Sequence, residues 1–139
     1  MTSPDWVLDT NVLISAALSR QGSPYALVQH ILAHARLVFS EPTFEELRTR
    51  LYRPKFDRYI GLSMREQVLH DLSACAIWVN IDASGGWSRD PDDDKFIATA
   101  LQAQGAIVVS GDQDLLTAQA PAGLRILTPA QALQAFEGR

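Results

Sequence analysis

The sequence predicts an α/β protein: a three-layer α/β/α sandwich with a central, mainly parallel, five-stranded sheet. Short runs rich in Val, Ile and Leu alternate along the chain with segments whose apolar residues recur at helical spacing. These runs lack polar alternation, which is typical of strands that helices cover on both faces. No repeat, low-complexity tract or linker interrupts the 139 residues. We therefore expect a single domain over residues 1–139.

The first half of the chain predicts two strands and three helices. A strand at residues 6–8 ends at a polar Asp-Thr-Asn sequence, and a mostly buried helix follows it. Pro24 is expected to open a second helix, because proline suits the first helical position. After a second strand at residues 37–39, Ser40 is a natural N-cap for a third helix, which ends before Pro54.

The second half predicts three further strands, each next to a helix. The strands are expected at residues 76–79, 106–109 and 124–127, and the helices after Ser63, over residues 92–104 and from Pro129. Gly105 suits the left-handed residue that ends many helices. Trp78 is expected in the core. Trp87 lies in the longest predicted loop, residues 82–91.

Composition excludes several classes of protein. The chain carries a formal net charge of −4, and its 47% apolar residues suffice for a core at this length. The single cysteine, Cys75, excludes an internal disulfide framework and a zinc site built on several thiolates. No apolar run approaches the ~20 residues of a membrane-spanning helix. With no secretory pattern at the N-terminus, we expect a cytoplasmic protein without a membrane partner.

Acidic residues stand where predicted strands end. Asp9 directly follows the first strand, and Asp112 follows the strand at residues 106–109 after two small residues. Because the carboxyl ends of parallel strands meet at one edge of a sheet, we expect these two carboxylates to lie close together. Glu46 and Asp94 belong to helices that could project them toward the same edge.

Such a group of carboxylates predicts a divalent cation. Their mutual repulsion is relieved by a hard cation with oxygen ligands, which implies Mg²⁺ or Mn²⁺. The three histidines lie away from the acidic motifs, so zinc held by nitrogen ligands is not expected. The chain also lacks a nucleophile-elbow motif and a Gly-rich phosphate loop with lysine. A carboxylate-bound metal can activate water and stabilise the leaving oxygen in a phosphodiester displacement.

Four motifs follow one another in a specific order along nearly the whole chain. They are VLDTNV at residues 7–12, EEL at 45–47 with RPKF at 53–56, DPDDDKF at 90–96 and SGDQDLL at 110–116. This order resembles that of the PIN-domain nucleases, especially the toxins of toxin–antitoxin pairs. The resemblance implies a PIN-like, Rossmann-like fold and a Mg²⁺- or Mn²⁺-dependent endoribonuclease that cleaves single-stranded RNA. It further implies a cognate antitoxin as partner and a homodimer.

The resemblance also implies roles for particular residues. The catalytic, metal-binding acids would be Asp9, Glu46, Asp94 and Asp112, and the supporting residues Asn11, Ser110, Asp93 and Asp114. Asp94 is chosen ahead of Asp93, the fallback, because Asp94 directly precedes the apolar helix in the register of the family's acid. Ser110 stands where threonine is more usual in the family and retains the hydroxyl group.

Positive charge is concentrated in one stretch despite the negative net charge. Six of the 12 basic residues lie between residues 48 and 65. Within it, Arg48, Arg53 and Lys55 are the candidates for binding RNA phosphates, since an acidic enzyme that acts on a polyanion needs local positive surface. The same stretch could instead be a solvated helix face or receive an acidic part of the antitoxin.

Two other functions stay open at this point. Haloacid dehalogenase-like phosphatases also place an Asp motif after the first strand and a Gly-Asp motif late in the chain. Here Asn11 replaces the second acid of that first motif, and 139 residues leave no room for a cap domain. A degenerate PIN domain that binds RNA or protein without cleavage is the other alternative, and the complete set of acids argues against it.

Overall fold

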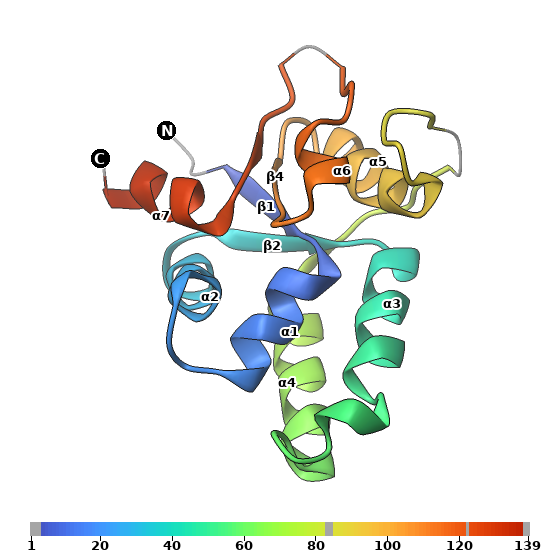
Figure 1. Cartoon of the computed structure of the whole chain (residues 1–139). Helices are drawn as coiled ribbons and strands as arrows, with labels where there is room; N and C mark the ends of the chain where they lie inside the picture. Colours follow the sequence, from blue (N-terminus) through green and yellow to red (C-terminus); the bar gives the residue numbers. More distant parts are fainter. Residues whose placement is uncertain (1–3, 83–84, 122, 138–139) are drawn as a thin grey trace.

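The computed structural model describes residues 4–82, 85–121 and 123–137. Its strands form one five-stranded sheet in the order β3-β2-β1-β4-β5, and all paired strands are parallel (Figure 1). The strands are β1 (Asp5–Leu8), β2 (Arg36–Phe39), β3 (Ile77–Trp78), β4 (Ile107–Val109) and β5 (Ile126–Leu127). The predicted α/β fold is therefore confirmed, with a sheet that is entirely parallel rather than mainly so.

Helices connect these strands. They are α1 (Thr10–Leu18), α2 (Ser23–His34), α3 (Glu41–Leu51), α4 (Leu62–Cys75), α5 (Asp94–Gln102), α6 (Gln113–Leu116) and α7 (Pro129–Glu137), with 3-10 turns η1 (Pro54–Phe56) and η2 (Pro91–Asp93). The backbone at Gly105 has a φ of +99°, as expected for a glycine that ends a helix. In the described part of the chain, no helix combines the length and apolar character needed to cross a bilayer.

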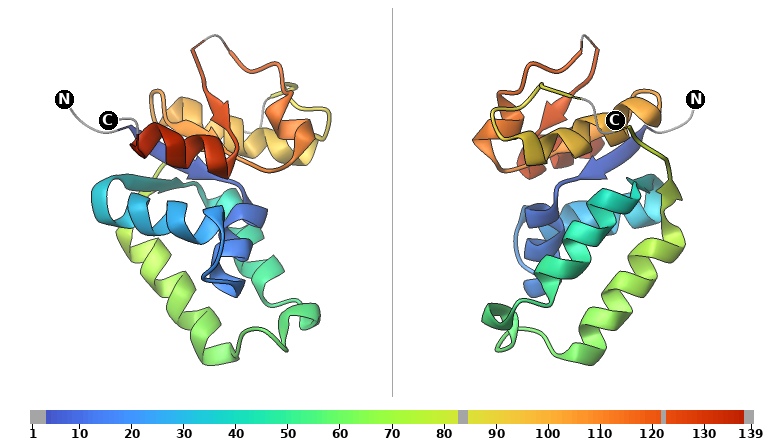
Figure 2. Two further views of the ribbon diagram at one scale, coloured as in Figure 1. Left: turned by 60° about the vertical axis from the view of Figure 1, so that its left-hand side comes forward. Right: turned by 90° about the vertical axis from the view of Figure 1, so that its right-hand side faces the viewer.

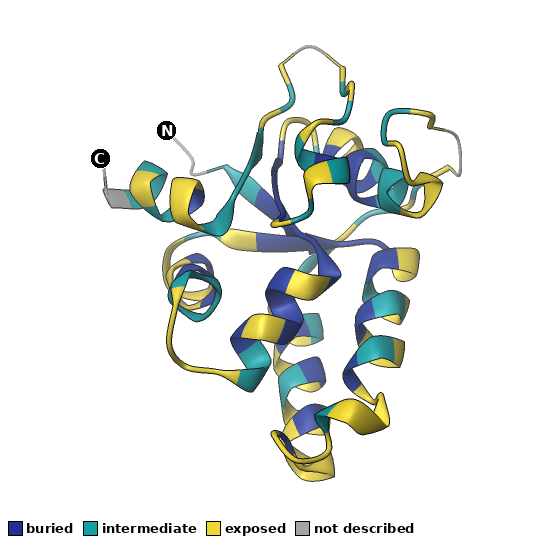
Figure 3. Cartoon of the chain, viewed as in Figure 1, coloured by how far each residue is buried: buried dark blue, intermediate teal, exposed yellow. Residues whose placement is uncertain are grey.

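The sheet separates two hydrophobic cores. Trp6 and Leu8 of β1 face a core that includes residues of α1, α2, α3, α4 and α7, whereas Val7 faces a smaller core with α5 and α6. Figure 2 shows α5 and α6 on one side of the sheet and α1 to α4 on the other. The central strands are buried and the outer helix faces are exposed (Figure 3). Burial on both faces explains why the strand sequences lack polar alternation.

Three helices begin directly at the carboxyl ends of central strands. Asp9 is the N-cap of α1 after β1, Ser40 is the N-cap of α3 after β2, and Asp112 is the N-cap of α6 after β4. The Ser40 amide donates to Thr43 Oγ1 at 3.0 Å, which completes the first turn of α3. Because parallel strands end at one edge, these caps bring the acidic motifs together there.

Two features of the fold differ from the sequence prediction. Trp78 was expected in the core but is 45% exposed, because β3 is a two-residue strand at the edge of the sheet. Its ring packs edge-on against Phe44 at 5.2 Å, and its Nε1 donates to the Ser73 carbonyl at 3.1 Å. Helix α6 was not predicted, since four residues are too few to show a helical period.

Candidate metal centre

Asp9 is held rigidly at the junction of β1 and α1. It is buried; its Oδ1 accepts from the Val12 amide at 3.0 Å, and its Oδ2 accepts from the Ser110 hydroxyl. The Asp9 amide donates to the Val109 carbonyl at 2.9 Å, which ties the end of β1 to β4. Burial raises the pKa of Asp9, the hydrogen bonds from Ser110 and Val12 oppose this, and the charge of Asp112 adds to the increase.

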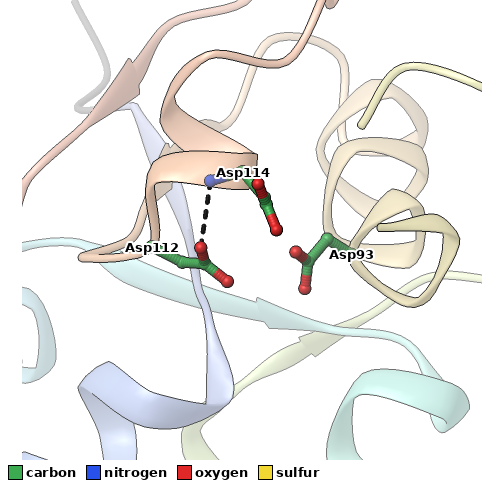
Figure 4. Close-up of side chains that lie close together, drawn as sticks. All are labelled: Asp93, Asp112 and Asp114. Carbon is green, nitrogen blue, oxygen red and sulfur yellow. Dashed lines mark hydrogen bonds between the residues drawn. The ribbon is translucent and has the colours of Figure 1, made fainter. Parts of the chain in front are cut away.

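Three carboxylates, including that of Asp112, lie close together. One oxygen each of Asp93, Asp112 and Asp114 lies within 4.8 Å of the others. Asp112 and Asp114 come from the start of α6, where the Asp114 amide donates to Asp112 Oδ1 at 2.9 Å. Asp93 ends η2 and faces them from the start of α5 (Figure 4). Segments distant in the sequence thus present oxygen ligands to one point.

The negatively charged form of the Asp93 side chain is electrostatically unfavourable at its position. Its pKa is raised to about 6, with burial as the largest cause. The negative charges that act in the same direction belong to Asp112, Asp90, Asp9 and Glu46. Asp93 Oδ2 is buried and has no hydrogen-bond partner among the described residues. An unpartnered buried oxygen amid like charges fits a hard divalent cation that takes only oxygen ligands.

Asp94, the acid that the sequence analysis placed at the metal, is not among the three acids that lie within 4.8 Å of one another. Its Oδ2 accepts from the Gly86 amide at 2.8 Å, and its Oδ1 accepts from the Ser88 amide at 2.7 Å. Consecutive residues point about 100° apart around a helix, so Asp93 and Asp94 face different neighbours. Asp93, the fallback in the sequence analysis, is the residue that faces Asp112 and Asp114.

Glu46 lies near the cluster but is already paired. Its carboxylate contacts Lys95 Nζ, and Arg50 Nη1 lies 3.3 Å from its other oxygen. Among the charges that raise the pKa of Asp93, that of Glu46 has the smallest effect. Glu46 is also not one of the three acids that lie within 4.8 Å of one another. The sequence analysis did not predict the pairing of Glu46 with Lys95, although Lys95 directly follows the acidic motif.

The remaining predicted site residues are not part of the group formed by Asp93, Asp112 and Asp114. Asn11 is exposed on the first turn of α1. Arg48 is exposed and pairs with Glu45, with Nη2 at 2.8 Å from Oε1. Arg53 and Lys55 follow the far end of α3, which leads away from the sheet edge (Figure 1). At 1.5 Å per residue, the last residue of α3, Leu51, is about 7.5 Å beyond Glu46 along the helix, and Arg53 and Lys55 come after it.

Ser110 links two acids of the site, which leads to a testable prediction. Besides donating to Asp9, its Oγ accepts from the Asp112 amide at 2.9 Å, and the residue is fully buried. Ser110→Ala is expected to lower the free energy of unfolding by about 1–3 kcal/mol, because a buried carboxylate loses a donor and an amide loses its acceptor. Urea denaturation measures this loss. Ser110→Thr is the control that keeps the hydroxyl, and equal stability of the Ala variant and the wild type would contradict the prediction.

Comparison with known proteins identifies the family. The sequence profile of the PIN domain matches residues 5–114, which is most of the chain. The chain belongs to the PIN-domain family. A relative in Methanocaldococcus jannaschii, an uncharacterised protein, is 28% identical over 141 aligned residues, covering 94% of this chain and 90% of the relative.

Solved structures share the fold at low sequence identity. PAE2754 from Pyrobaculum aerophilum superposes with a TM-score of 0.66 at 12% identity, covering 98% of this chain and 91% of its own. VapBC2 from Rickettsia felis, bound to a DNA fragment from its promoter, superposes with a TM-score of 0.60 at 13% identity, covering 89% of this chain and 98% of its own. FitAcB from Neisseria gonorrhoeae superposes with a TM-score of 0.57 at 22% identity, covering 90% of this chain and 98% of its own. These similarities establish the architecture.

Proposed function

We propose that this chain is a Mg²⁺- or Mn²⁺-dependent endoribonuclease that cleaves single-stranded RNA, and that it is the toxin of a toxin–antitoxin pair. The observation that supports the activity is the convergence of Asp93, Asp112 and Asp114, with an unpartnered buried oxygen on Asp93, at the functional edge of a PIN-domain sheet. Asp9 lies close enough to Asp112 for their charges to interact. This arrangement offers oxygen ligands, which suit a divalent cation.

Different residues of the chain would have different roles in such a site. Asp93, Asp112 and Asp114 would hold the cation, and Asp9 would complete the set. When bound, a divalent cation can activate water and neutralise charge on the leaving oxygen of a phosphodiester. Lys95 and Arg50 compensate Glu46, which reduces the negative charge that a polyanionic substrate meets on approach. Ser110 and the start of α1 fix the orientation of Asp9.

A cleavage assay tests this function. Purified protein is incubated with structured and unstructured RNA in the presence of Mg²⁺, Mn²⁺ or a chelator. We expect cleavage of the unstructured RNA with metal and none with chelator. The Asp9→Asn and Asp112→Asn variants, purified identically, must be inactive, which excludes a contaminating nuclease. Metal-independent cleavage, or RNA binding without cleavage under all conditions, would contradict the proposal; the second result would indicate the degenerate, non-cleaving domain.

The partner proposal is tested separately. We propose that a cognate antitoxin inserts a segment near the acidic cluster and that the chain forms a homodimer. Co-expression with the product of the adjacent reading frame is expected to give a purified complex that no longer cleaves RNA. Sedimentation velocity of the isolated chain measures its oligomeric state. A monomer, or full cleavage activity with that product bound, would contradict the corresponding part of the proposal.

RNA binding gives a further prediction, based on the basic stretch after Glu46. Arg48→Glu combined with Arg53→Glu is expected to weaken RNA binding and to reduce the slope of log K against log salt by about 1.4, since each lost phosphate contact on a single strand removes about 0.7. Fluorescence anisotropy across a salt titration, in the Asp112→Asn background, measures both effects. Arg125→Glu, exposed next to the opposite edge strand, is the matched control. An unchanged slope would show that these arginines only form a solvated helix face.

A further inference from the structure

The segment before η2 is hydrogen-bonded to both elements that carry the acidic cluster. The Asp94 carboxylate holds two backbone amides of this segment, those of Gly86 and Ser88, at 2.8 and 2.7 Å. The Ser88 hydroxyl then donates to the backbone carbonyl of Asp114 at 3.1 Å. Asp94 is the direct neighbour of Asp93. Ser88 therefore connects the start of α5, which carries Asp93, to α6, which carries Asp114.

The backbone of this segment is shaped for close approach to Asp94. A Cβ added at Gly85 would lie 2.8 Å from Asp94 Oδ2, closer than real Cβ atoms come, and Gly86 has a φ of +100°. On the other side, Trp87 packs against the smaller core and its carbonyl accepts from the Gln119 amide at 2.9 Å. The segment is thus fixed by a carboxylate, by a core contact and by two links to the α6 region.

We propose that Asp94 and Ser88 are positioning residues that set the separation of Asp93 and Asp114, and through it the affinity of the site for a divalent cation. Like charges on the two carboxylates push α5 and α6 apart before a cation binds. The link from Asp94 through Ser88 to Asp114 opposes this separation. This inference rests on the proposed metal dependence and assigns Asp94 a role other than that of a ligand.

The test measures Mn²⁺ binding to the full chain by calorimetry without RNA. Ser88→Ala is expected to lower the Mn²⁺ affinity about 5-fold, as for the loss of one hydrogen bond. Asp94→Asn, which can no longer accept from both amides, is expected to lower it about 10-fold. Asp93→Asn abolishes binding. Asp92→Asn is the control, since it removes the same charge from an exposed neighbouring residue.

Two further measurements separate positioning from a general loss of structure. Ser88→Thr keeps the hydroxyl and is expected to restore Mn²⁺ affinity. The combined Ser88→Ala and Asp94→Asn variant is expected to lose less than the product of the two single effects, because both residues act through the same segment. Hydrogen exchange at the Gly86 and Ser88 amides should accelerate in Asp94→Asn while the urea midpoint changes little.

These measurements distinguish a failure of the positioning proposal from a failure of the proposed function. A loss in Asp94→Asn as complete as in Asp93→Asn would make Asp94 a ligand and overturn the proposal. Unchanged Mn²⁺ affinity in Ser88→Ala would overturn it as well, as would unchanged exchange of the Gly86 and Ser88 amides in Asp94→Asn. If the wild-type chain binds no Mn²⁺ while these amides respond as expected, the proposed function fails and the hydrogen-bonded link alone is established.

Discussion

Asp93→Asn is expected to lower the rate of metal-dependent RNA cleavage by about 10² to 10³-fold, because electrostatic groups at a reaction centre commonly contribute this much. The neighbouring Asp94→Asn is expected to lower it only about 10-fold, as for a residue that supports a metal ligand. The two variants remove the same charge from adjacent positions. Their difference reflects which carboxylate faces Asp112 and Asp114 and which one holds the preceding segment.

The measurement is single-turnover cleavage of an unstructured RNA at pH 7.5, with Mn²⁺ below the Kd of the wild type. Asp92→Asn serves as the control for the loss of one charge near the site. Below the Kd the cleavage rate follows metal occupancy, so the weaker Mn²⁺ binding expected for Asp94→Asn appears as the lower rate. An active Asp93→Asn together with an inactive Asp94→Asn would show that Asp94, not Asp93, binds the metal with Asp112 and Asp114.

The stability of the metal-free protein is expected to fall as the pH rises from about 4 to above 6. The pKa of Asp93 is raised from its ordinary value of 3.8 to about 6 in the folded state, so the folded state binds more protons than the unfolded state in this window. The free energy of unfolding then decreases with pH. Since Asp93 is partly exposed to solvent, its contribution is on the order of 1 kcal/mol. Burial raises the pKa of Asp9 as well, and the effect has the same sign.

Urea denaturation with chelator at pH 4.5 and pH 7.5 measures this effect. Asp93→Asn should be more stable than the wild type at pH 7.5 and nearly equal to it at pH 4.5, where the Asp93 carboxyl is mostly protonated. Mn²⁺ is expected to stabilise the wild type at pH 7.5 and to have little effect on this variant. Asp92→Asn should retain the wild-type pH dependence. Parallel pH profiles for wild type and Asp93→Asn would show that the cluster does not destabilise the metal-free fold.

The sequence predicts the convergence of Asp9 and Asp112 because each follows a strand of a parallel sheet, and the carboxyl ends of such strands meet at one edge. Each follows a parallel strand, β1 pairs with β4, and the Ser110 hydroxyl reaches Asp9. The runs of Val, Ile and Leu predict all five strands for a similar reason. Apolar residues on both faces leave few alternatives to a sheet covered by helices.

The choice between Asp93 and Asp94 could not be made from the sequence. Both stand at the start of one helix, and which of them turns toward Asp112 depends on where the segment at Gly86 and Ser88 places its amides. The pairing of Lys95 with Glu46 joins long side chains of two helices, so it depends on how α5 and α3 pack. Such details follow from tertiary packing, which local patterns do not specify.

Asp9 and the acidic cluster of Asp93, Asp112 and Asp114 belong to helices on opposite sides of the sheet. Asp9 caps α1, which packs in the larger core, while Asp93 and Asp114 stand on α5 and α6 over the smaller one. On the proposed function, a single ion would therefore cross-link the two halves of the molecule. Chelation would both stop the chemistry and remove this cross-link, so the same ion would contribute to catalysis and to stability.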